Sequence, residues 1–207
     1  MHILQPGLKL YKNYLSLEKQ EQLVQIIHNI LPEAPFFKAI SPRKKPLGSL
    51  MTNMGEFGWY ADATDGYRYI NHHPNTQKKW PRIPVEIMNI WRKLADYPID
   101  PQCCLINYYN EQNPNLEMHK DLDEQDFKAP VLSISLGNTC SFRYSTSPKS
   151  QSPSKTIKLE SGTILVMGGE SRLIYHSVNK VFFGSNKLLD NSFGLGRLNL
   201  TLRVVKN

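Results

Sequence analysis

The last segment of the chain alternates strictly between apolar and polar residues. Leu198, Leu200, Leu202 and Val204 take one set of alternate positions, and Arg197, Asn199, Thr201 and Arg203 take the other. Successive side chains of a strand point to opposite faces, so the segment predicts a strand with one apolar and one polar face. The two arginines either lie on an exposed edge or face a cavity, where planar guanidinium groups suit a carboxylate ligand.

Two helices are predicted ahead of a series of short strands. Ser16 can cap a helix that runs to about Leu31, and a second helix begins near Pro84. Segments rich in β-branched, aromatic and aliphatic residues follow at 103–109, 131–136, 140–144, 163–167, 173–176 and 197–205. Helices followed by closely spaced strands predict an α+β fold, with helices packed on an antiparallel sandwich or barrel. The Ser/Pro-rich stretch 145–154 is predicted to be a loop between strands.

Length and cysteine content indicate one intracellular domain. The chain has 207 residues, of which 40% are hydrophobic, values typical of a single globular domain. Cys103, Cys104 and Cys140 form neither a disulfide framework nor a CxxC zinc motif. We find no secretory signal and no apolar run near the roughly 18 residues of a membrane helix. We therefore expect a cytoplasmic monomer, or a nuclear one in a eukaryote, without membrane contact.

The formal net charge of +7 favours a polyanionic partner, since basic side chains bind phosphates. The densest basic cluster comprises Arg43, Lys44 and Lys45, between two prolines. The cluster is either a solvated loop or a phosphate-binding segment.

His119, Asp121 and His176 are candidate metal ligands. Residues two apart in an extended segment point the same way, so His119 and Asp121 can bind one ion. Each histidine alone could equally be structural. Together the three match the two-histidine, one-carboxylate set of non-haem Fe(II) oxygenases, which leaves coordination positions open, whereas a structural zinc site would need a fourth ligand. Arg197 and Arg203 could then bind the far carboxylate of a diacid.

Several motifs resemble the AlkB family of alkylation-repair dioxygenases. They are Cys104–Tyr109 (CLINYY), His119–Glu124 (HKDLDE), 130–137 (PVLSISLG), 168–176 (GGESRLIYH), the Arg197-x-Asn199-x-Thr201-x-Arg203 strand, and upstream 51–55 (MTNMG) with Gly58-Trp59 and Gly66-Tyr67-x-Tyr69. The resemblance covers roughly residues 50–205. It implies a double-stranded β-helix, or jelly roll, within a single domain. Residues 1–50 would be an N-terminal extension with the first helix, 51–80 a nucleotide-recognition lid, 81–100 a helical segment and 101–207 the catalytic core.

The resemblance also implies roles for individual residues. His119, Asp121 and His176 would hold Fe(II), and 2-oxoglutarate would bind to Asn107, Tyr109, Arg197, Asn199 and Arg203, with O2 as the second cosubstrate. Trp59 would stack on a flipped base opposite His119, Tyr67 would touch the DNA backbone and Asp123 would face the base edge. Met51, Thr52, Tyr69 and Arg172 would also contact the substrate.

The activity implied is oxidative demethylation of bases such as 1-methyladenine and 3-methylcytosine, in single-stranded or flipped-base DNA and, as an alternative, in RNA. Formaldehyde and succinate would be released. Two other hypotheses stay open. The same oxygenase could act on a protein side chain or a small molecule. Alternatively, the chain could be a nucleic-acid-binding module without catalysis.

Overall fold

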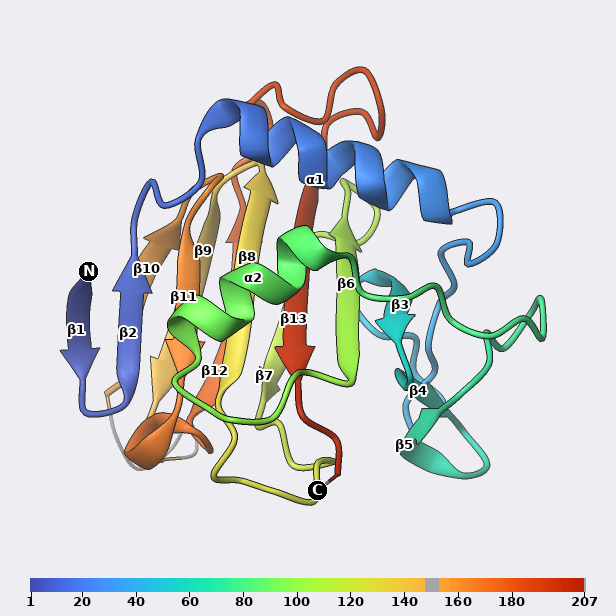
Figure 1. The fold of residues 1–207 in the computed structure, drawn as a ribbon, viewed down its shortest axis with the longest axis horizontal. Helices are drawn as coiled ribbons and strands as arrows, with labels where there is room; N and C mark the ends of the chain where they lie inside the picture. The colour runs from blue at the N-terminus through green and yellow to red at the C-terminus, as the bar shows by residue number, and fades with distance from the viewer. Residues whose placement is uncertain (148–152, 207) are drawn as a thin grey trace.

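Two antiparallel β-sheets and two helices form the body of the molecule (Figure 1). The computed structural model describes residues 1–147 and 153–206. The large sheet has the strand order β1 (His2–Gln5), β2 (Leu8–Tyr11), β11 (Ile164–Met167), β8 (Val131–Gly137), β13 (Arg197–Arg203), β6 (Cys103–Tyr109) and β3 (Leu50–Gly55). The small sheet has the order β10 (Lys155–Leu159), β9 (Cys140–Ser145), β12 (Tyr175–Val181) and β7 (Leu116–His119). A separate hairpin consists of β4 (Gly58–Asp62) and β5 (Gly66–Ile70).

Both helices lie on the outer face of the large sheet (Figure 1). The first, α1 (Leu17–Ile30), begins as predicted at Ser16, whose Oγ accepts a hydrogen bond from the Lys19 backbone nitrogen. The second, α2 (Val85–Leu94), begins after Pro84. Neither helix in the described part of the chain is long and apolar enough to span a membrane.

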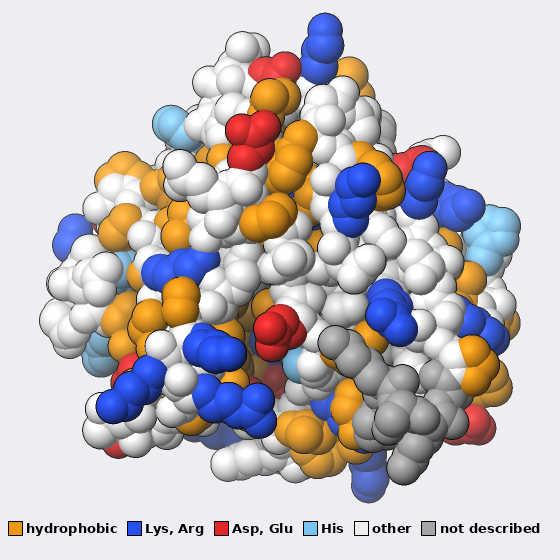
Figure 2. Space-filling model, turned by 180° about the vertical axis from the view of Figure 1, so that it is seen from behind, with side chains coloured by type: hydrophobic (Ala, Val, Ile, Leu, Met, Phe, Trp, Pro, Cys, Tyr) orange, Lys and Arg blue, Asp and Glu red, His pale blue; other side chains and the backbone are white. Residues whose placement is uncertain are grey.

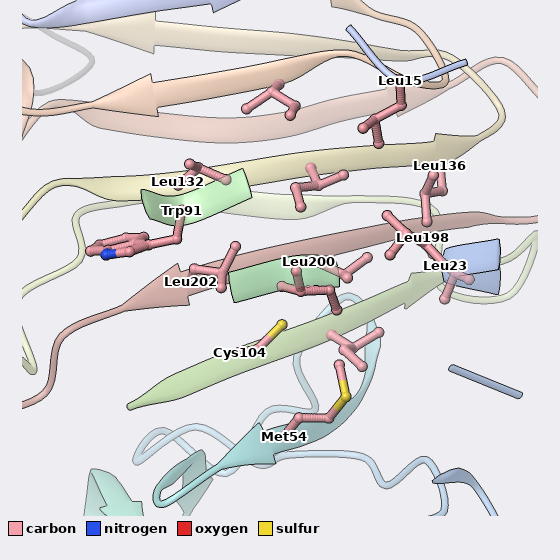
Figure 3. Packing of buried hydrophobic residues seen from close by; sticks show 14 of the residues in the cluster. Leu15, Leu23, Met54, Trp91, Cys104, Leu132, Leu136, Leu198, Leu200 and Leu202 are labelled. Atoms are coloured by element: carbon pink, nitrogen blue, oxygen red, sulfur yellow. The ribbon is translucent and has the colours of Figure 1, made fainter. Parts of the chain in front are cut away.

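The central strand β13 has the two-faced character that its sequence predicts. Leu198, Leu200 and Leu202 are fully buried and belong to the same core cluster as Leu23 of α1 and Trp91 of α2 (Figure 3). The polar residues of the strand face the other way, into a cavity between the sheets. β13 pairs with β6 on one side and β8 on the other, with Asn199 opposite both Asn107 and Ser135. Its polar face therefore lies among the polar residues of its neighbours.

A second apolar cluster joins the two sheets beside this cavity. Leu8, Val131 and Leu165 of the large sheet pack with Phe142 and Val178 of the small sheet. The two sheets thus form the predicted α+β jelly roll, with its helices on one side and the site between the sheets.

The structure differs from the sequence-based expectations at several boundaries. Residues 1–50, expected to be an extension, contribute β1 and β2 to the large sheet, because Leu8 and Leu10 are buried where β2 pairs with β11. The expected strand 173–176 begins only at Tyr175, since a 3-10 turn (η1, Gly169–Ser171) precedes it, and continues to Val181. β3, expected in the lid, pairs with β6. Of the predicted loop 145–154, residues 148–152 lie outside the described residues.

Candidate active site

Two neighbouring strands of the small sheet bring the candidate metal ligands together. His119 ends β7 and pairs in register with His176 of β12, and Asp121 follows two residues later. One ligand atom from each of the three side chains lies within 4.8 Å of the others. His119 Nε2 is 3.6 Å from Asp121 Oδ1. Side chains far apart in the sequence therefore converge on a volume that suits one ion.

Backbone hydrogen bonds set the orientation of both imidazoles. Nδ1 of His119 lies 2.8 Å from the Glu117 carbonyl, and Nδ1 of His176 lies 3.1 Å from the Ile174 carbonyl. A carbonyl oxygen only accepts, so each Nδ1 donates this hydrogen bond, and Nε2 is the ring nitrogen left to bind a metal.

The charges of the site also suit a divalent cation. Burial would raise the pKa of Asp121, but the Arg203 guanidinium at 3.0 Å, with His176 and His119, lowers that pKa below its usual value. Asp121 is thus a carboxylate whose buried Oδ2 has no hydrogen-bond partner among the described residues. Burial, together with His119, lowers the pKa of His176 to about 4. This set of two imidazoles and one carboxylate fits Fe(II).

Glu124, which the sequence did not single out, organises the support behind Asp121. Its carboxylate lies 2.7 Å from Arg172 and 3.4 Å from Arg203, and it accepts a hydrogen bond from the Tyr69 hydroxyl. Arg172 also donates to the Asp121 carbonyl at 3.0 Å. Tyr69 and Arg172, both predicted to contact the substrate, bind Glu124 instead of lining the cavity.

A cavity of about 650 Å³ extends from the metal ligands along the polar face of β13. Its lining includes all five residues predicted to bind 2-oxoglutarate: Asn107, Tyr109, Arg197, Asn199 and Arg203. They lie on the adjacent strands β6 and β13.

Hydrogen bonds hold the buried side chain of Arg197 in place in the cavity lining. It is 1% exposed, and its Nη atoms donate to the carbonyls of Asn138 and Leu159 and, at 2.7 Å, to Ser135 Oγ. Nε of Arg197 and Nη1 of Arg203 are buried without a hydrogen-bond partner among the described residues. Buried donors are normally satisfied. The unpaired donors at these two arginines therefore fit a ligand with carboxylate oxygens.

The mouth of the cavity carries the predicted base-recognition residues. Trp59 Nε1 donates to Asp123 Oδ2 at 2.7 Å, and the Trp59 ring stacks on Tyr67 at 5.7 Å between centroids. Burial raises the pKa of Asp123, while the hydrogen bond from Trp59 opposes that rise. Met51 and His119 line the same cavity. An aromatic surface and a carboxylate thus lie next to the metal ligands.

Thr52, also predicted to contact the substrate, is not among the residues that line this cavity. Its hydroxyl is buried and donates to the Ala34 carbonyl at 2.8 Å. Met51 and Thr52 are neighbours in β3, so their side chains leave opposite faces of the sheet, and Met51 alone of the two reaches the cavity.

Comparisons with known proteins agree with this geometry. Residues 7–203 match the model of the 2OG-Fe(II) oxygenase superfamily. The chain is 36% identical over 198 residues to an alpha-ketoglutarate-dependent dioxygenase AlkB homolog of Caulobacter vibrioides, covering 96% of this chain and 87% of the relative. It is also 36% identical to AlkB of Escherichia coli, covering 88% and 83% of the two chains.

A solved structure supports the fold over its full length. OsALKBH1 superposes with a TM-score of 0.84 at 26% identity, covering 98% of this chain and 99% of the other. The resemblance in the sequence motifs is thereby confirmed. The chain belongs to the 2OG-Fe(II) oxygenase superfamily, and within it to the AlkB family of dioxygenases.

Proposed function

We propose that this enzyme oxidatively removes N-methyl groups from the bases of alkylated nucleic acid, with 1-methyladenine and 3-methylcytosine in DNA as its substrates. One observation carries the proposal: a single cavity holds the metal ligands, the two arginines and, at its mouth, Trp59, Tyr67 and Asp123. The first two groups suit the cofactor and a diacid, and the third suits a base.

Bound Fe(II), with 2-oxoglutarate and O2, supplies the oxidation of a carbon–hydrogen bond in the N-methyl group. His119, Asp121 and His176 would hold the metal. The Nδ1 hydrogen bonds orient both imidazoles so that Nε2 can bind the metal, and Arg203 keeps Asp121 ionised. The buried guanidinium groups of Arg197 and Arg203 would bind and orient the cosubstrate carboxylates.

The rim residues would present the methyl group to this centre. The target atoms lie on the pairing edge of the base, so the base must be single-stranded or flipped out of a duplex. Trp59 would stack on it, a contact worth roughly 1–3 kcal/mol per base. The lesions carry positive charge, and Asp123 would favour them over neutral bases. Hydroxylation of the methyl yields a hydroxymethyl group, which leaves as formaldehyde and restores the base.

Two more distant relatives are named for nucleic-acid substrates. They are the DNA N(6)-methyladenine demethylase ALKBH1C of Arabidopsis thaliana, 28% identical over 97% of this chain and 49% of its own length, and the tRNA demethylase abh1 of Schizosaccharomyces pombe, 27% identical over 97% of this chain and 80% of its own length. Their names support nucleic acid as the substrate class and make RNA a necessary arm of any test.

The test is a mass-spectrometric repair assay on matched DNA and RNA oligonucleotides that carry one 3-methylcytosine. With Fe(II), 2-oxoglutarate and ascorbate, the DNA lesion should become cytosine, with succinate and formaldehyde formed in equal amounts. Omission of 2-oxoglutarate should abolish conversion. Cosubstrate turnover without conversion of either oligonucleotide would reject nucleic acid as the substrate, and tight oligonucleotide binding without succinate would indicate a mere binding module.

A further inference from the structure

A basic turn at the mouth of the cavity has no part in the chemistry described above. We define the basic turn as residues 41–45, which carry the exposed side chains of Arg43, Lys44 and Lys45. Arg43 and Lys45 line the same cavity as Trp59 and Tyr67, whereas Lys44 does not. Figure 2 shows Lys and Arg side chains gathered beside a hollow in which acidic and histidine side chains are visible. Two cations of the turn thus face the opening through which a base would enter.

Local hydrogen bonds hold the backbone of the basic turn. Ser41 donates from its backbone nitrogen to the Lys45 carbonyl at 2.8 Å and accepts from the Lys44 nitrogen at 2.8 Å. The Lys45 nitrogen also donates to Ser41 Oγ at 3.2 Å. Just before the turn, the Ile40 nitrogen donates to the Ala61 carbonyl of β4, the strand that contains Trp59. The turn is therefore fixed relative to the aromatic surface, and binding an anion would order only the long side chains.

Among the described residues, the cations of the basic turn have no acidic partner. Within residues 1–147 and 153–206, no carboxylate forms an ion pair with Arg43, Lys44 or Lys45. By contrast, Arg68 on β5 pairs with Asp62 at 2.6 Å and with Asp65 at 3.4 Å. The unpaired cations at the cavity mouth are available to an anionic ligand, and Arg68 is not.

We infer that Arg43 and Lys45 bind the backbone phosphates that flank the target nucleotide. This inference rests on the proposed function, because it requires a base to be seated at Trp59. The base would enter the cavity while its sugar and phosphates stay at the mouth. There Arg43 can bind a phosphate in a bidentate manner, and Lys45 acts as a point charge. An acidic protein segment would also satisfy the charges, but it would leave the neighbouring aromatic surface unused.

The first test is the salt dependence of binding to a single-stranded oligonucleotide with one 3-methylcytosine. Each phosphate contact contributes about 0.7 to the slope of log K against log salt for single strands. The variant R43Q/K45Q should therefore make this negative slope shallower, with its magnitude reduced by about 1.4. The control variant K19Q/K93Q removes the same charge from exposed positions on α1 and α2, on the other face of the large sheet, and should leave the slope unchanged. K44Q should change it less than either single variant, R43Q or K45Q.

The second test removes the charge from the nucleic acid instead. Neutral methylphosphonates in place of the two phosphates flanking the lesion should weaken binding by the wild type and should have little further effect on R43Q/K45Q, as expected for directly coupled groups. Equal losses for both proteins, or a salt slope that falls as much in the control variant, would overturn the inference. Failure of the proposed function is seen separately, as absence of base repair by the wild type in the mass-spectrometric assay.

Discussion

The guanidinium of Arg203 lies 3.0 Å from the carboxylate of Asp121, and both side chains are almost fully buried. Arg203 also lines the cavity beside Asn199 and Thr201. One side chain therefore stabilises a metal ligand in its charged form and faces the space for the cosubstrate. If 2-oxoglutarate binds in this cavity as proposed, we expect Arg203 to link metal binding to cosubstrate binding.

Replacement of Arg203 by Lys should separate the effect of its positive charge from the effect of its planar guanidinium shape. Lysine keeps the positive charge near Asp121 but loses the planar fork that can contact two carboxylates at once. We expect the KM for 2-oxoglutarate to rise at least about tenfold, the equivalent of roughly 1.4 kcal/mol of lost binding. Steady-state succinate formation measures the change. An unchanged KM would contradict a cosubstrate contact by Arg203.

Glu124 should contribute more to stability than an exposed glutamate. Its loss of charge in E124Q leaves the buried Arg172 guanidinium without its counter-ion, and breaking a buried pair costs about 3–5 kcal/mol. The matched control is E56Q, because Glu56 pairs with Lys206 at the surface, where such pairs are worth about 0–1 kcal/mol. Urea unfolding measures both variants. Similar losses of unfolding free energy in the two would refute a special role for Glu124.

The buried position of Glu124 was not predictable from its sequence context. It lies in the acidic run Asp121–Asp126, which has the composition of a solvated loop. Its partners Tyr69, Arg172 and Arg203 come from three distant segments, so no pattern of neighbouring residues in the sequence indicates the contact. The metal ligands and the polar face of β13 could be predicted, because residues two apart in a strand share a face and the residue types suit one kind of ion.

The two-residue alternation of side chains along a strand also bears on the assignments of Met51 and Thr52. Met51 and Thr52 were both expected to contact the substrate, although neighbours in a strand point to opposite faces. The first two strands, β1 and β2, were missed for another reason. Each has only four residues, and only tertiary pairing with β11 makes the apolar side chains of β2 part of a core.

Asp123 should contribute to binding of the methylated base and not to binding or turnover of 2-oxoglutarate. D123N removes the negative charge but keeps an oxygen that can accept the hydrogen bond from Trp59. We expect kcat/KM for 3-methylcytosine to fall about tenfold or more, while 2-oxoglutarate decarboxylation without substrate stays near the wild-type rate. Parallel assays of base repair and succinate measure the two quantities. Equal losses in both would argue against recognition of the charged base.

The three cysteines should be unreactive in the folded enzyme. All three are buried, and burial raises the pKa of Cys103 to about 12 and raises the pKa of Cys140 as well. The thiolate is the reactive form, so neutral protonated thiols predominate at pH 8. Iodoacetamide should modify none of them in the native protein and all three after unfolding in guanidinium chloride, as read by mass spectrometry. Rapid modification of native protein would contradict this burial.

The most direct measurement of the central claim is a calorimetric titration with Mn(II), a divalent ion that accepts the same ligand types, under anaerobic conditions with 2-oxoglutarate present. The wild type should bind one ion per chain. H119A, D121A and H176A should each weaken binding by about 100-fold or more, since even the loss of an outer partner of a ligand costs about 10–100-fold. Wild-type affinity in any one of these variants would show that the three side chains do not hold a common ion.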